Sequence, residues 1–271
     1  MPADVGPARG ILRPAPGPGR FHHARLAPSA ALAGVVQHFW IVRWDLQGAA
    51  PQVRETLPHP NVHLVFEPGR TRIHGIHSGR FTRVLEQHGA VFGIKFRPGA
   101  FRPFLQRPVS TLRNRSVSLQ EVFGIAGAPL EASLFAQEDD ARQAGIAEAF
   151  LGARLPPVDD DVTLVGEMVD GICADRGITT VEHLLARWPM SRRRLQRLFN
   201  EYVGIGAKWV VNRYRMHEAL ERLARGGAAD WAGLALELGY FDQPHFIRDF
   251  KALVGCTPTE YMGRFPPPAK P

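Results

Sequence analysis

Capping residues in the second half of the chain predict the same pair of helices twice, and this repeat limits the possible folds more than any other feature of the sequence. In the first pair, Thr180 can cap the helix VEHLLARW, which ends at Pro189, and Ser191 can cap RRRLQRLFNEY, which ends at Gly204. Ser and Thr hydroxyls accept hydrogen bonds from the free N–H groups of a first helical turn, whereas Pro and Gly end helices. This order predicts a short helix, a tight turn and a longer helix.

The same order recurs about fifty residues later. Asp230 can cap WAGLALEL, which Gly239 stops, and Asp242 can cap QPHFIRDFKALV, which ends at Gly255. A capped short helix, a turn and a longer helix form the helix-turn-helix pattern. Apolar residues fall where the helices of each pair must face each other, at Leu184, Leu185, Leu195, Leu198 and Phe199 in the first pair and at Leu234, Ala235, Leu238, Phe246 and Phe250 in the second.

The predicted outer face of the longer helix in each pair is polar and basic. Its side chains are Arg193, Gln196 and Arg197 in the first pair and Gln243, His245 and Arg248 in the second, with Arg192 and Arg194 flanking the first set. In the major groove Arg pairs with guanine and Gln with adenine, while flanking arginines can hold phosphates. One such face alone is more often a solvated helix surface. Its duplication on either side of a connecting helix at residues 207–223 predicts double-stranded DNA as the partner.

Two stretches, SRRRLQRLFNEYVG and LALELGYFDQPHFIRDFKALVGCTPTEY, resemble the first recognition helix and the second unit of the AraC/XylS family of transcription regulators. The resemblance covers about residues 161–263. It implies that the six outer-face side chains named above face DNA bases at a promoter operator, that RNA polymerase is a partner and that the protein is an activator. The sequence departs from the family pattern at two places, at Trp231 with Gly233 in the first helix of the second unit and at Pro244. Gly233 lowers helix propensity by about 1 kcal/mol, and Pro244 lacks an N–H donor in a first helical turn.

The first half of the chain has a different pattern. Short apolar stretches separated by Gly and Pro predict strands at residues 35–44, 62–66 and 91–96. A capping box at Ser118 and Glu121 precedes helices predicted within residues 130–151, which can pack inside the first domain or form a dimer seam.

A linker is predicted at residues 152–161, because the segment GARLPPVDDD contains paired prolines and successive acids. The chain therefore divides into a β-rich mixed domain at residues 1–151 and an all-α domain with two helix-turn-helix units at residues 162–265. The predicted fold class is α+β.

The first domain also contains stretches, LPHPNVHLVFEPG and VFGIKFRPGAFRPFL, that resemble the sensing or dimerising domains of such regulators. The candidate lining of a pocket for a small-molecule effector consists of Trp40, Trp44, His63 and Phe66. Side chains of these types are more often part of a core. Histidines at residues 59, 63, 74 and 77 fit no standard metal-binding spacing, so neither a metal nor another cofactor is expected. Three possibilities stay open: an effector-controlled regulator, a homodimer, and an architectural DNA-binding protein whose first domain binds no small molecule.

Composition and the absence of certain motifs limit the classes of protein to which this chain can belong. The 271 residues and 45% hydrophobic content suit two domains with sizeable cores, and the net charge of +7 favours a polyanionic partner. Long apolar runs and the apolar core of a secretory signal are missing from the sequence, so no membrane association and a cytoplasmic location are expected. Two cysteines are too few for a disulfide framework, and the first 170 residues contain none, which excludes a cysteine-dependent methyl acceptor. No GxSxG, P-loop or HExxH motif is present, so the chain is not expected to be an enzyme.

Overall fold

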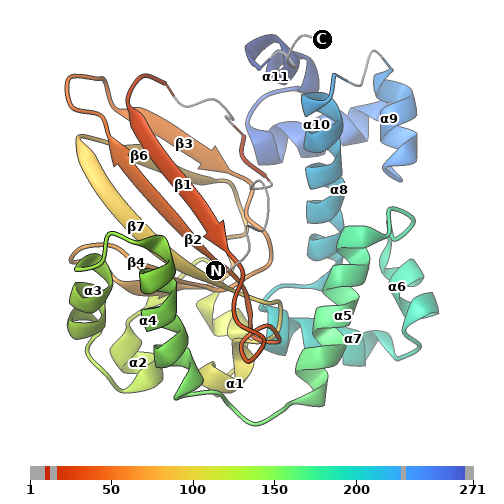
Figure 1. Ribbon diagram of the computed structural model, residues 1–271. Coiled ribbons are helices and arrows are strands. Elements are labelled where there is room, and N and C mark those ends of the chain that lie inside the picture. Colours follow the sequence, from red (N-terminus) through yellow and green to blue (C-terminus); the bar gives the residue numbers. More distant parts are fainter. Residues whose placement is uncertain (1–9, 13–16, 227–229, 266–271) are drawn as a thin grey trace.

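The computed structural model describes residues 10–12, 17–226 and 230–265. A β-rich part precedes a helical part, as the α+β prediction required (Figure 1). The strands are β1 (Arg20–Leu26), β2 (Val36–Asp45), β3 (Gln52–Thr56), β4 (His63–Phe66), β5 (Arg72–His74), β6 (Phe81–Leu85), β7 (His88–Phe96) and β8 (Ser116–Val117). The helices before residue 153 are α1 (Arg102–Leu105), the 3-10 turn η1 (Val109–Leu112), α2 (Leu119–Phe123), α3 (Gly127–Phe135) and α4 (Asp140–Gly152).

Six of the strands form one antiparallel sheet in the order β1-β2-β7-β4-β5-β8, and β3 pairs with β6 in a second, two-stranded sheet. Alternation along β2 sends Phe39 and Ile41 to one face of the large sheet and Trp40 and Trp44 to the other. The Phe39 face is covered by α1 to α4 and carries the main core. The Trp44 face carries a smaller core with Leu46, Leu85 and Val91.

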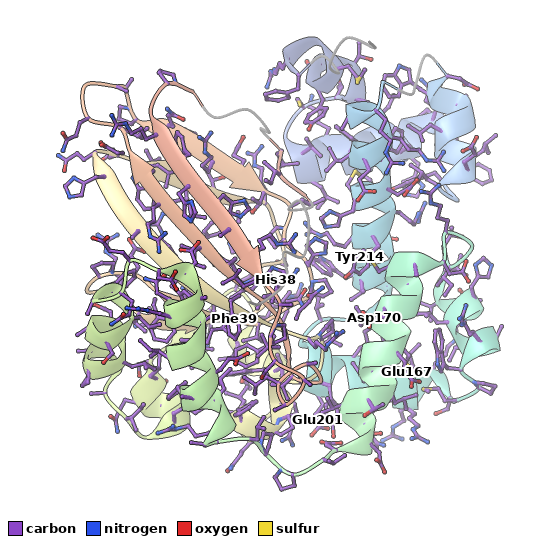
Figure 2. The ribbon with its side chains drawn as sticks, in the orientation of Figure 1. His38, Phe39, Glu167, Asp170, Glu201 and Tyr214 are labelled. Carbon is purple, nitrogen blue, oxygen red and sulfur yellow. The ribbon has the colours of Figure 1, made fainter. Side chains whose placement is uncertain are left out.

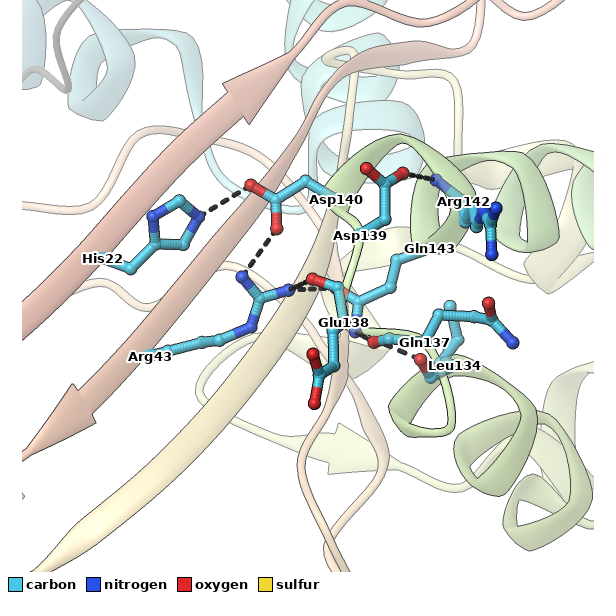
Figure 3. Close-up of polar contacts among 9 residues, drawn as sticks. All are labelled: His22, Arg43, Leu134, Gln137, Glu138, Asp139, Asp140, Arg142 and Gln143. Atoms are coloured by element: carbon cyan, nitrogen blue, oxygen red, sulfur yellow. Dashed lines mark hydrogen bonds and ion pairs between the residues drawn. The ribbon is translucent and has the colours of Figure 1, made fainter.

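Helices α3 and α4 pack inside the first domain, because Leu134, Ala147 and Phe150 are buried in its main core. A polar network fastens α4 to the sheet (Figure 3). Arg43 of β2 forms an ion pair of 2.7 Å with Asp140, and its Nη2 donates to Oε1 of Gln143 at 3.1 Å. Gln143, only 2% exposed, donates in turn to the carbonyls of Leu134 and Gln137.

The helical part contains α5 (Asp160–Ala174), α6 (Val181–Arg187), α7 (Arg192–Leu198), the π-helical turn η2 (Phe199–Val203), α8 (Ala207–Ala224), α9 (Trp231–Glu237), α10 (Gln243–Val254) and α11 (Pro258–Arg264). The pairs α6–α7 and α9–α10 are the two predicted helix-turn-helix units. Figure 1 shows them at opposite ends of α8, with the β-rich part beside them. Within the described residues, no helix is long and apolar enough to cross a membrane.

The β-rich part contacts both units. Near the first unit, a side chain at Gly204 would crowd Ile76 and Val109, so the end of η2 lies directly against η1 and the loop that follows β5. Near the second unit, Leu12 and Leu57 are 2% and 1% exposed and belong to the same core cluster as α8, α10 and α11. Because packing continues across it, the domain boundary at residues 152–161 stays a prediction. The structure has an irregular segment there, between α4 and α5.

Polar groups join the two parts as well. Arg102 of α1 donates from Nη2 to Oε1 of Glu201 in η2 at 2.8 Å, and Glu201 is labelled in Figure 2. Arg80 donates from Nη1 to the carbonyl of Val254, the last residue of α10, at 2.7 Å. The ring of His59 stacks on that of His217 in α8, with centroids 4.2 Å apart.

Candidate DNA-binding surface

The first unit is assembled as its caps predict. The Thr180 hydroxyl accepts from the His183 N–H at 3.3 Å and starts α6, and the Ser191 hydroxyl accepts from the Arg194 N–H at 3.2 Å and starts α7. Leu184, Leu195 and Leu198 are at most 3% exposed and hold the two helices together. The longer helix continues through the π-helical turn η2 and ends at Gly204, whose φ of +88° lies in the left-handed region.

The outward face of α7 carries every residue predicted from the sequence, and all five are exposed. Arg192 forms an ion pair with Glu182 of α6, and Arg194 lies 3.8 Å from Asp161 at the start of α5. Arg193 and Arg197 form no ion pair within the described part of the chain, so their guanidinium groups are available to a partner. Gln196 lies on the same face.

The second unit repeats this construction. Asp230 accepts from the Gly233 N–H at 2.8 Å, and Asp242 accepts from the His245 N–H at 2.7 Å. A Cβ at Gly233 would meet the carboxylate end of Asp230, which would have to shift to make room. Phe246 and Phe250 are fully buried between α9, α10 and α11.

The outward face of α10 begins at its first turn. Pro244 lies there, where its missing N–H leaves no intrahelical bond unmade. His245 and Arg248 are exposed and Gln243 is half-buried. The His245 imidazole lies 3.7 Å from Asp249, one turn further on, a neighbour that sequence reasoning did not identify.

Arg215 of α8 is a second residue that the sequence did not single out. Its Nε donates to the carbonyl of Leu238 at 2.5 Å, and its guanidinium lies 3.8 Å from the centre of the Tyr240 ring. Burial lowers the pKa of Arg215 and raises the pKa of Tyr240 to about 12. The side chain thereby fixes the turn between α9 and α10 to the connecting helix.

Spacing between the units is set by α8. Its 18 residues span about 27 Å at 1.5 Å per residue. One turn of B-DNA is about 34 Å, and helix-turn-helix proteins place two reading helices about that far apart on one side of the duplex. The length of the connecting helix is therefore of the right order for two successive major-groove segments.

The predicted effector pocket is only partly assembled. Trp40 donates from Nε1 to Nδ1 of His63 at 3.3 Å, and Trp44 lies on the same face of the large sheet. Phe66 lies on the opposite face, fully buried in the main core, so it does not join the other three. Burial, followed by the charge of Lys95, lowers the pKa of His63 to about 3, so its ring is neutral at pH 7. Among the residues described, no three His, Cys, Asp or Glu side chains converge as a metal site requires.

Comparisons with known proteins bear on both halves. Residues 184–264 match a family described as a helix-turn-helix domain, and residues 24–118 match a family described as a domain of unknown function, DUF6597. YkgA of Escherichia coli (strain K12), named as a putative HTH-type transcriptional regulator, is 32% identical over 85 residues, which are 31% of this chain and 35% of YkgA. This chain thus matches about a third of the length of that relative.

Among solved structures, ToxT from Vibrio cholerae O395 is 11% identical, with a TM-score of 0.37 over 92% of this chain and 98% of that one. Wild-type ToxT from Vibrio cholerae strain SCE256 with an unsaturated fatty acid bound is 12% identical, with a TM-score of 0.35 over 92% of this chain and 93% of the other.

Two capped units at the ends of one connecting helix, together with the family match over residues 184–264, define a DNA-binding helix-turn-helix domain. Within this domain lie the stretches that resemble the AraC/XylS family.

Proposed function

We propose that the chain is a sequence-specific DNA-binding transcription regulator in which α7 and α10 enter two successive major-groove segments of a promoter operator. The observation that carries the proposal is the pair of exposed, Arg- and Gln-bearing faces at opposite ends of α8. Either face alone fits a solvated helix. Two faces on capped helices, joined by a connector of about 27 Å, fit a reader of one side of the duplex.

The side chains on the two outward faces are assigned by their positions on α7 and α10. Arg193, Gln196 and Arg197 in the first unit and Gln243, His245 and Arg248 in the second are assigned to base edges, and His245 among them has an acidic neighbour, Asp249 at 3.7 Å. Arg192 and Arg194 are paired with Glu182 and Asp161, and are assigned to phosphates beside the groove. An acidic neighbour lowers the affinity of an arginine for phosphate, so these two contribute less to binding than their charge alone suggests.

The β-rich domain is assigned a regulatory role, because it takes part in the packing of both units. Val109 lies against the end of the first unit, and Leu57 completes the core of the second. A small-molecule effector near Trp40 and His63, or a second copy of the chain, would act on DNA binding through these contacts. RNA polymerase is the expected partner at the promoter. The alternative is an architectural DNA-binding protein whose first domain binds no small molecule.

A selection of genomic fragments by the full-length chain at two salt concentrations tests the proposal. The full chain is used because Leu12 and Leu57 belong to the core of the second unit. Enrichment of one asymmetric motif of roughly two helical turns supports a reader with two units. Salt-sensitive binding without a motif supports the architectural alternative, and the absence of DNA binding refutes both.

Effector control is tested separately by thermal unfolding of the full chain with candidate small molecules. A ligand that binds only the folded state raises the unfolding temperature. Such a ligand should also change operator affinity, and the effect should weaken in Trp40→Ala. A ligand that stabilises the chain without changing operator affinity would contradict the regulatory role.

A further inference from the structure

Phe241 lies in the turn between α9 and α10, and its side chain is 89% exposed. Single exposed apolar residues are common on protein surfaces, so the exposure alone indicates no partner. Its position is informative, because Phe241 directly precedes Asp242, the residue that caps α10. An apolar residue at this position usually packs against the fourth residue of the helix. In α10 that residue is Phe246.

Tyr240 occupies the place that Phe241 would otherwise take. Its ring is 4% exposed and lies with its centroid 5.4 Å from that of Phe246. The Arg215 guanidinium covers its other side at 3.8 Å from the ring centre. Because Tyr240 is held inward and Asp242 is fixed by its capping bond to the His245 N–H, the intervening Phe241 side chain is directed away from the protein.

The surface around Phe241 belongs to the proposed DNA interface. Gln243 and His245 follow it in the first turn of α10, and the exposed Pro244 adds a second apolar group. Residues at the start of a reading helix are those that approach base edges. The apolar group that a base presents in the major groove is the C5-methyl of thymine.

We propose that Phe241 reads a thymine methyl group in the half of the operator that α10 contacts. The proposal rests on the proposed function and deepens it, since it assigns a base preference to a residue outside the Arg and Gln set. Covering one methyl group contributes about 0.8 kcal/mol, which is roughly a fourfold difference in dissociation constant.

The test uses the operator selected by the wild-type chain, as a fluorescently labelled duplex. Each thymine in the half whose contacts are lost in Arg248→Ala is replaced singly by deoxyuridine, which lacks only the methyl group. Wild-type chain is expected to bind one of these duplexes roughly fourfold more weakly. Phe241→Ala should bind the thymine duplex roughly fourfold more weakly than wild type and should not distinguish uracil from thymine at that position.

Two further variants serve as controls for this test. Phe241→Leu keeps an apolar group and should retain part of the thymine preference. Val84→Ala removes an apolar side chain that is 51% exposed on β6, away from the proposed interface, and should retain all of it. Equal affinity of wild type for every thymine and uracil duplex overturns the inference, as does unchanged discrimination by Phe241→Ala.

A rise in the fluorescence of 2-aminopurine beside the contacted step would show that the ring unstacks bases, which also overturns a methyl contact. Failure of the wild-type chain to select any operator would overturn the proposed function and this inference together. An operator without a uracil effect would overturn the inference alone.

Discussion

Replacing Arg213 by methionine should leave the stability of the folded chain nearly unchanged, although the residue is charged and only 1% exposed. Arg213 lies on α8 and faces the β-rich domain. Its Nη2 donates to the carbonyl of Ser78 at 2.6 Å, and its guanidinium lies 4.3 Å from the centre of the Trp209 ring. Within the described residues, its Nε and Nη1 have no hydrogen-bond partner.

The expected magnitude follows from opposing contributions. Burial lowers the pKa of Arg213 from 12.5 to about 10. At neutral pH the group is charged in both the folded and the unfolded chain, so this depression opposes folding by about 3 kcal/mol at 1.36 kcal/mol per unit. The hydrogen bond to Ser78 contributes about 1.5–3 kcal/mol in the other direction. The contact with Trp209 adds about 0.5–2 kcal/mol. Methionine keeps most of the volume, so the change should lie within about 1–2 kcal/mol of zero.

Urea unfolding at pH 7, followed by far-ultraviolet circular dichroism, measures this change. Arg215→Met is the matched control, because Arg215 is two residues away on the same helix and bonds both Leu238 and Asn212. The control should lose more stability than Arg213→Met and should weaken DNA binding through the second unit. A loss of about 4 kcal/mol or more in Arg213→Met, roughly that of breaking a well-paired buried ion pair, would refute the reasoning.

Three further predictions concern the units and the β-rich domain. Arg197→Ala and Arg248→Ala should each weaken operator binding by about 1–3 kcal/mol and relax the preference at one base pair; a uniform loss across sequences in a binding titration would make them phosphate contacts instead. Leu198→Ala or Phe246→Ala should lower the free energy of unfolding by about 2–5 kcal/mol in a urea titration, and unchanged stability would contradict the packing of the units. Because the folded-state pKa of His63 is lowered from 6.5 to about 3, the unfolded chain takes up this proton first as the pH falls below 6.5. Stability should therefore fall between pH 6.5 and about pH 3, and His63→Gln should show a shallower fall in unfolding temperature over this range.

The helical part was predictable because its signals are local. Thr180, Ser191, Asp230 and Asp242 each accept from an N–H three positions further along the chain, so four short polar residues mark four helix starts. Strands at β2, β4 and β7 were equally visible as short apolar stretches. In both cases the information lies within one turn of helix or a few residues of strand.

The predicted effector pocket shows what local sequence patterns indicate and what they leave open. Alternation along β2 and along β4 indicates which residues of each strand share a face. It does not indicate how the faces of two strands correspond, because that depends on their pairing through β7. Alternation along β4 already puts Phe66 and His63 on opposite faces, so grouping the two contradicted the sequence pattern itself. The pairing through β7 then places His63 on the face of Trp40, and Phe66 on the other face with Phe39 and Phe92.

Contacts between the two halves could not be predicted either, because they join residues that are distant in the sequence. They also mean that the C-terminal part does not form its whole core alone. Leu57 and Met216 share one core although they lie far apart in the chain, and their side chains give no sign of each other in the sequence. A DNA-binding unit whose core includes a residue of the β-rich domain cannot shift relative to that domain without exposing apolar surface. The orientation of α10 is thus coupled to the β-rich domain by packing, which is the physical requirement for any signal received there to reach DNA.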